Sequence, residues 1–118
     1  MFEVIHTYSR KQAIEDGILI DVTEMAEEAG FRYPVAVTRT LWEAHIKTEG
    51  TERSGDTNGR LWDTLWMLRV RLADPSVQGS AETRYEVLYG RKRVQLKAVC
   101  GPGDNYEPVI TIMLPDEA

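Results

Sequence analysis

The sequence has little of several features that define familiar protein classes. Cys100 is its only cysteine, which excludes an internal disulfide bond and a zinc site built from several thiolates. The longest apolar runs are only a few residues, far short of the roughly 20 that span a bilayer. The first residues show no basic segment followed by an apolar one, as a secretory signal would. We therefore expect a cytoplasmic protein with no membrane association.

Histidine is scarce as well. His6 and His45 are the only two, and neither is paired with a cysteine or a carboxylate at the spacing of a metal site on a helix. We expect no metal site and no cofactor. Because His45 lies among the apolar residues of a predicted helix, we expect it to be a buried or half-buried structural residue.

What the chain does contain is typical of a folded domain. Of its 118 residues, 42% are hydrophobic and 28% are charged, which predicts a single domain over residues 1–118 with one core. The net charge of -5 argues against nonspecific nucleic-acid binding, because affinity for phosphate comes from clustered lysine and arginine.

Capping residues and helical periodicity predict four helices. The first three run from Arg10 to about Asp16, from Asp21 or Thr23 to Gly30, and from Thr38 to about Lys47. The strongest runs from Gly59 to about Ala73 and carries a wide apolar stripe. Its six large members are expected to form the centre of the core: Leu61, Trp62, Leu65, Trp66, Leu68 and Leu72.

After residue 81 the hydrophobic period changes from helical to two, which indicates strands. A two-residue turn at Gly90 and Arg91 would place Val87 opposite Val94, Tyr85 opposite Leu96 and Arg84 opposite Lys97. A third strand is expected over residues 109–114, whereas residues 18–21 read as extended and residues 31–37 as loop or strand. We therefore predict an α+β fold in two layers, with N-terminal and central helices packed on one face of a C-terminal three-stranded antiparallel meander.

The predicted hairpin is basic although the protein is acidic. Arg84, Arg93 and Lys97 should share its solvent face, and Arg91 and Lys92 should lie at its turn. Such charges can simply protect a short sheet from edge pairing. They can also bind an acidic protein surface or nucleic acid. Tyr85 and Tyr89 should face the opposite side of the hairpin. This disfavours nucleic-acid binding, because proteins that bind single-stranded nucleic acid place aromatic side chains beside the basic ones.

Two further groups of residues suggest chemistry. The string Val4 to Tyr8, followed by Ala13 to Leu19, resembles the first motif of ADP-ribosyltransferase-like folds. That resemblance implies an NAD-using enzyme in which His6 hydrogen-bonds the nicotinamide ribose, with Tyr8 beside it and a later acid such as Glu107. Cys100 could be imagined as a nucleophile, but no base accompanies it, and we expect a small buried residue at a strand end.

Several longer strings carry a resemblance that extends over nearly the whole chain. They cover residues 4–10, 16–23, 31–38, 59–63, 96–104 and 110–115. In these strings the chain resembles an uncharacterised family of small bacterial proteins found on plasmids and integrative elements. The resemblance implies a genomic setting and assigns no reaction or site residues.

The leading functional expectation is a noncatalytic binding or regulatory protein of a bacterial mobile element, because no catalytic constellation is apparent. An anti-CRISPR or other anti-defence inhibitor is one specific form of that role. Its partner would be a protein of the host or of the element, and the sequence leaves open whether the chain forms a homodimer. The alternatives are an ADP-ribosyltransferase-like enzyme and nucleic-acid binding through the basic hairpin.

Overall fold

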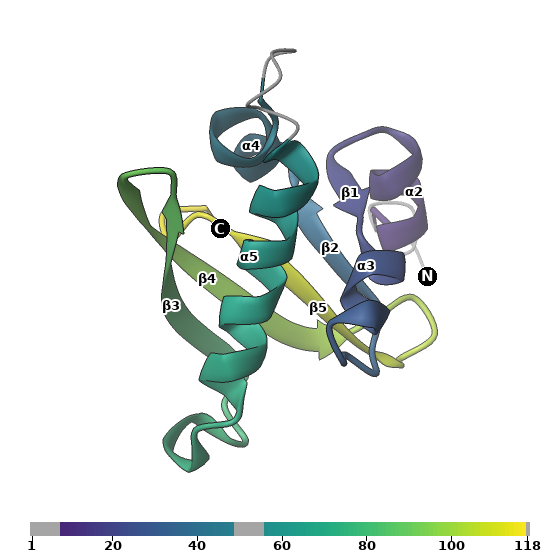
Figure 1. Cartoon of the computed structure of the whole chain (residues 1–118). Coiled ribbons are helices and arrows are strands. Elements are labelled where there is room, and N and C mark those ends of the chain that lie inside the picture. Colours follow the sequence, from purple (N-terminus) through teal and green to yellow (C-terminus); the bar gives the residue numbers. More distant parts are fainter. Residues whose placement is uncertain (1–7, 49–55, 118) are drawn as a thin grey trace.

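A mixed five-stranded sheet organises the part of the chain that the structure describes, and Figure 1 shows it with α5 crossing in front. The computed structural model describes residues 8–48 and 56–117. The strands lie side by side in the order β1-β2-β5-β4-β3. Their bounds are Leu19–Asp21 for β1, Val35–Thr38 for β2, Glu82–Tyr89 for β3, Lys92–Pro102 for β4 and Pro108–Met113 for β5.

The hairpin of β3 and β4 has the predicted register. Tyr85 pairs with Leu96, Val87 with Val94, and the residues at positions 84 and 97 are also opposite one another. Gly90 adopts φ 66 in the two-residue turn, a left-handed conformation that glycine reaches without steric cost. The inward residues of β3 are buried and the outward ones exposed, so the period of two in the sequence marks the two faces of the sheet.

The expectation of a three-stranded sheet is corrected, because β1 and β2 extend it to five strands. Strands β3, β4 and β5 are antiparallel neighbours as predicted, whereas β2 pairs in parallel with β5 and antiparallel with β1. The first three residues of β2 were expected as loop or strand, and Thr38 as the start of the next helix. Their pairing with β5 joins segments far apart in the sequence, which local periodicity cannot reveal.

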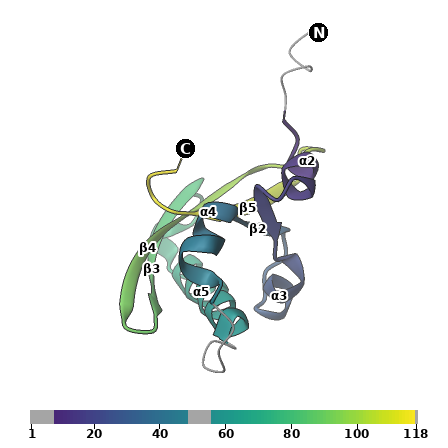
Figure 2. The same ribbon diagram turned by 90° about the horizontal axis from the view of Figure 1, so that it is seen from above.

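Helices α3 (Thr23–Glu28), α4 (Arg39–Leu41) and α5 (Asp56–Leu72) lie on one face of the sheet, as the view from above shows (Figure 2). The predicted third helix continues from α4 into a π-helical turn, η1 (Trp42–Ile46), closed by a 2.8 Å bond from the Lys47 amide to the Trp42 carbonyl. The largest fully buried side chains between these elements and the sheet include Leu41, Ile46, Leu65 and Leu68. This layer holds the main core. A short 3-10 helix, η3 (Pro75–Val77), follows α5.

Helix α2 (Arg10–Glu15) lies on the opposite face, so the expected two-layer arrangement with all helices on one face is wrong. The Arg10 guanidinium donates to Thr111 Oγ1 at 2.7 Å, on the face of β5 that points away from α5. The Asp104 carboxylate accepts from the amides of Lys11 and Arg10 at 2.9 and 2.8 Å, and these bonds hold its pKa below the usual range. A carboxylate distant in sequence therefore caps this six-residue helix.

Within residues 8–48 and 56–117, no helix is both long enough and apolar enough to cross a bilayer.

Two glycines give opposite predictions for stability. Gly30 ends α3 with φ 102, and a Cβ there would lie 3.0 Å from Arg69 Nε. Gly30→Ala should therefore destabilise the fold by about 1 kcal/mol or more. Gly59 lies in α5 with ordinary backbone angles and nothing within 4 Å of a Cβ, so Gly59→Ala should stabilise by about 0.5 kcal/mol. Urea unfolding of both variants measures the difference, and equal midpoints would contradict the left-handed helix end at Gly30.

Candidate functional site

Exposed apolar side chains gather along α5 and the neighbouring strand β3. Among the residues that the structure describes, eight large hydrophobic side chains are exposed. Four of them lie on these two elements: Trp66, Met67 and Val70 on α5 and Leu88 on β3. Clustered exposed apolar residues mark interaction surfaces more often than scattered ones do. This region is the candidate site.

The outward side of α5 carries a tryptophan ridge, which we define as Trp62, Trp66 and Val70. The residues follow one another at steps of four, so they line one stripe of the helix. The indole rings of Trp62 and Trp66 are stacked, with centroids 5.9 Å apart and planes 8° from parallel. Trp62 is half-buried against the core, whereas Trp66 is 45% exposed.

The exposure of Trp66 corrects the expectation that all six large apolar residues of this helix form the core. Leu61, Leu65 and Leu68 are buried, and Leu72 is half-buried. Each residue turns the helix by about 100°, so Trp66 is rotated away from the face that Leu65 turns to the sheet. The apolar stripe is wider than the surface that the sheet covers.

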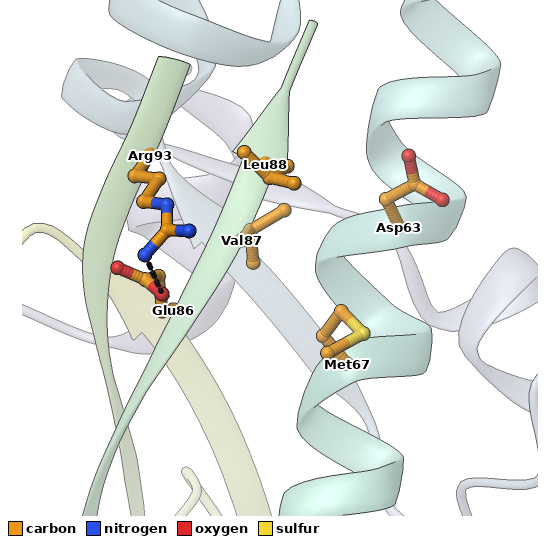
Figure 3. A pocket seen from close by; sticks show the side chains of 6 residues that line it. All are labelled: Asp63, Met67, Glu86, Val87, Leu88 and Arg93. Carbon is orange, nitrogen blue, oxygen red and sulfur yellow. Dashed lines mark ion pairs between the residues drawn. The ribbon is translucent and has the colours of Figure 1, made fainter. Parts of the chain in front are cut away.

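A hollow of about 280 Å³ lies beside the ridge, between α5 and β3 (Figure 3). Met67 and Asp63 reach it from α5, Leu88 and Glu86 from β3, and Arg93 from β4. The Arg93 guanidinium lies 3.9 Å from the Glu86 carboxylate, and both side chains are largely exposed. An exposed pair at this distance contributes little to stability and can exchange partners.

Among the described strands, β3 forms an edge of the sheet, and its side without a neighbouring strand borders this hollow. The Cys100 amide donates to the Ala81 carbonyl at 2.8 Å, so the backbone N–H and C=O groups of Ala81 point toward β4. By the alternation of an antiparallel ladder, the residues that turn their backbone groups away from β4 are Glu82, Arg84, Glu86 and Leu88. In agreement, Arg71 Nε on α5 donates to the Arg84 carbonyl at 3.3 Å.

A buried polar cluster fastens α5 to this edge strand. The Tyr85 hydroxyl donates to the Thr64 carbonyl at 2.8 Å, and the hydroxyls of Tyr89 and Thr64 are 2.6 Å apart. Thr64 Oγ1 also donates to the Arg60 carbonyl at 2.7 Å. Burial raises the pKa of Tyr89 to about 12 and raises that of Tyr85 well above its ordinary value. Both phenols are neutral donors that position the helix.

His45 belongs to the rim of the same cluster. Its ring stacks on Tyr89 with centroids 5.8 Å apart and planes 10° from parallel, and Arg60 Nη1 donates to its carbonyl at 2.9 Å. Burial lowers the pKa of His45, and the positive charges of Lys92 and Arg60 lower it further. The prediction of a half-buried structural histidine is confirmed.

The structure separates the basic residues proposed as a binding patch. Arg84 and Arg93 lie on the outer face, where Glu82 lies 3.1 Å from Arg84 Nε and Glu86 pairs with Arg93. Lys92 is opposite Tyr89, so it belongs to the inner face, and Arg91 occupies the turn. Lys97 was expected to be solvent-exposed, but it is only 9% exposed, and its Nζ donates to the Glu117 carbonyl at 2.8 Å. The chain after β5 covers it.

Of the three residues that an NAD-using enzyme would need, the structure describes Tyr8 and Glu107. His6 lies outside the described residues. The Tyr8 hydroxyl donates to Asp16 at 2.6 Å, and Glu107 accepts from the Asn105 amide at 2.9 Å. The side chains of Tyr8 and Glu107 line two adjacent hollows that share Arg10 and Asp104. In both hollows Asp104 is bonded to the start of α2.

Cys100 is exposed, which corrects the expectation of a buried residue. It faces inward near the end of β4, in a hollow that Gly30 and Phe31 line together with Leu72 at the end of α5. Among the described residues, no group of three or more histidine, cysteine, aspartate or glutamate side chains could hold a metal ion.

Comparison with known proteins gives one finding. The model of a family of unknown function, DUF6573, matches residues 1–118. The chain belongs to the DUF6573 family. No curated protein and no solved structure gives a significant match to this DUF6573 protein.

The predicted meander already placed β3 at an edge of the sheet, and the structure confirms that position. Sequence reasoning did not connect this edge with a binding site. One signal was present in the sequence of this DUF6573 protein. The outward residues of β3 alternate as Glu82, Arg84 and Glu86, with opposite charges at successive outward positions. This pattern gains meaning only when β3 is known to lack a neighbour on one side.

The tyrosine cluster predicts a loss of stability at alkaline pH. Because the pKa of Tyr89 is raised from 10.0 to about 12, the unfolded chain loses this proton first. The contribution of Tyr89 to the free energy of unfolding is complete below pH 10.0. It should fall as the pH rises toward about 12, by about 1.4 kcal/mol per pH unit. The raised pKa of Tyr85 acts in the same direction.

Urea unfolding across this pH range checks the effect. Tyr89→Phe should lose less stability between pH 10 and 12 than the wild type, although its stability at neutral pH should be lower by about 1 kcal/mol for the missing hydrogen bond. Tyr106→Phe, at an 88% exposed position, serves as the control. An equal alkaline loss in the wild type and Tyr89→Phe would rule out the role assigned to Tyr89.

Proposed function

We propose that this protein is a noncatalytic binding or regulatory protein that binds another protein through the tryptophan ridge of α5. One observation carries the proposal: Trp66 is 45% exposed on a regular helix while its neighbour Trp62 is half-buried beneath it. Tryptophan is among the residues that contribute most to protein interfaces, because it buries a large rigid apolar surface on binding.

The surroundings of Trp66 support an interface with a polar rim. Val70 continues the ridge by one helical turn, and Met67 lies beside it. Asp63 and Arg69 lie three residues before and after Trp66, so they flank the indole on either side. An apolar centre with charged residues at its margin is the usual arrangement of a protein interface. The expected partner surface is an apolar pocket large enough for an indole ring.

The placement of charge supports protein binding over nucleic-acid binding. Arg84 and Arg93 each have a carboxylate neighbour, and Lys97 is covered. Two of the basic residues of the hairpin therefore lie beside a carboxylate and a third is buried, which weakens their attraction for a phosphate backbone. The aromatic residues of the ridge lie on α5, away from the outer face that carries Arg84 and Arg93.

We place this role in the cytoplasm of a bacterium that carries a plasmid or integrative element, with a protein of the host or of the element as the partner. The resemblance of the strings quoted above supports that setting. An inhibitor of a host defence system, such as an anti-CRISPR protein, is the specific form we favour. Such an inhibitor can act by occupying a surface and needs no catalytic group.

Replacement of one exposed tryptophan tests the proposal. The tagged protein is used to capture partners from lysates of several bacterial hosts, and a stoichiometric partner is identified by mass spectrometry. Trp66→Ala should weaken binding of that partner at least about tenfold, because it removes an interface anchor. The matched control is Tyr33→Ala, since Tyr33 is also 45% exposed but lies in the loop before β2.

The affinity is measured with the purified partner by isothermal titration calorimetry. A partner that binds wild type and Trp66→Ala equally well would overturn the assignment of the ridge. The absence of a stoichiometric partner from every host tested would count against the binding role itself.

A further inference from the structure

The free edge of β3 has a charge pattern that complements itself. Its outward residues are, in order, Glu82, Arg84, Glu86 and Leu88. If a second copy of β3 lies antiparallel along this edge with the pairing centred on Tyr85, Arg84 of each copy is opposite Glu86 of the other. Two cross-strand pairs of opposite charge result, on the same face of the extended sheet.

The registers centred one residue to either side do not have this property. Pairing centred on Arg84 would place that arginine opposite itself and Glu82 opposite Glu86. Pairing centred on Glu86 would place that glutamate opposite itself. Like charges directly opposite one another destabilise a strand pair. The register centred on Tyr85 also joins residues whose backbone N–H and C=O groups all point outward from β3, as an antiparallel ladder requires.

Helix α5 has a second pattern with the same symmetry. Asp63 and Arg71 lie four residues before and four residues after Met67. In an antiparallel pair of α5 helices centred on Met67, Asp63 of each copy would lie near Arg71 of the other. The two centres are neighbours, because Met67 and Tyr85 line one hollow between α5 and β3. A single two-fold axis that passes beside this hollow would relate both the strands and the helices.

We infer that a second copy of this chain occupies the β3 edge and forms a two-fold symmetric dimer with a continuous sheet. Such an interface is isologous, since the same surface of each copy contacts its equivalent. In the dimer the Arg84 carbonyl accepts a hydrogen bond from the backbone amide of Glu86 of the second copy. This bond replaces the 3.3 Å bond that Arg71 Nε donates to the same carbonyl in the single chain. Arg71, whose side chain is 42% exposed, then turns toward Asp63 of that copy.

The two tryptophans of the ridge are not needed for this contact, although Val70 lines the hollow beside the proposed axis. Trp66 is turned by about 100° around α5 from Met67, the residue at the proposed axis. The dimer therefore goes beyond the proposed function, and either can fail without the other. Trp66→Ala should leave the dimer intact.

Charge exchange tests both the dimer and its register. Sedimentation equilibrium of the wild type should show a dimer. Arg84→Glu places glutamate opposite glutamate twice, and Glu86→Arg places arginine opposite arginine twice, so each should raise the dissociation constant of the dimer by about tenfold or more. The double variant Arg84→Glu/Glu86→Arg restores both pairs and should return the dissociation constant to near the wild-type value.

Mixing the two single variants gives an independent readout. At a concentration where each alone is mostly monomeric, the two together should form a heterodimer, because the two glutamates of one then face the two arginines of the other. Arg32→Glu, an exposed arginine in the loop after α3, is the matched control and should leave the dimer unchanged. Circular dichroism shows that each variant is folded.

Three outcomes would overturn the inference. One is a wild-type protein that stays monomeric up to the highest soluble concentration. Another is a dimer that neither single variant weakens. The third is a double variant that folds but does not recover the dimer, which would show that Arg84 and Glu86 are not opposite one another.

Discussion

Thr64 is the residue through which α5 is held to the edge of the sheet. Its carbonyl accepts from Tyr85, and its hydroxyl lies against that of Tyr89, at the centre of an otherwise apolar contact. The helix cannot slide along β3 without breaking these buried hydrogen bonds, and a buried polar group left without a partner is costly. The distance from the tryptophan ridge to the β3 edge is fixed in this way, and so is the nearness of Met67 to Tyr85.

Local chemistry was enough to predict the hairpin. Gly90 and Arg91 allow a two-residue turn, and a turn of that length leaves one register that buries Tyr85 and Val87 together. The helices before it were predicted for a similar reason, since Ser9 and Thr38 each cap the helix that follows with their own side chain. These features depend on residues only a few positions apart.

The remaining features depend on contacts between distant residues. Strand β2 is placed by its pairing with β5, and helix α2 by the hydrogen bond between Asp104 and the Arg10 amide. Lys97 is buried because its side chain bonds to the Glu117 carbonyl. None of these contacts leaves a periodic trace in the sequence. The exposure of Trp66 was missed for the same reason, because it follows from where the sheet ends, although the predicted meander had already left β3 at an edge.

The order of the strands also bears on how the chain folds during synthesis. β5 is the last of the five strands to be made, yet it lies at the centre of the sheet between β2 and β4. While the ribosome is still making β3 and β4, β2 has only the three-residue β1 beside it. Its other edge, rich in valine, stays unpaired until β5 emerges. Chains cut short before residue 108 would therefore expose this strand and be prone to aggregate or to be degraded.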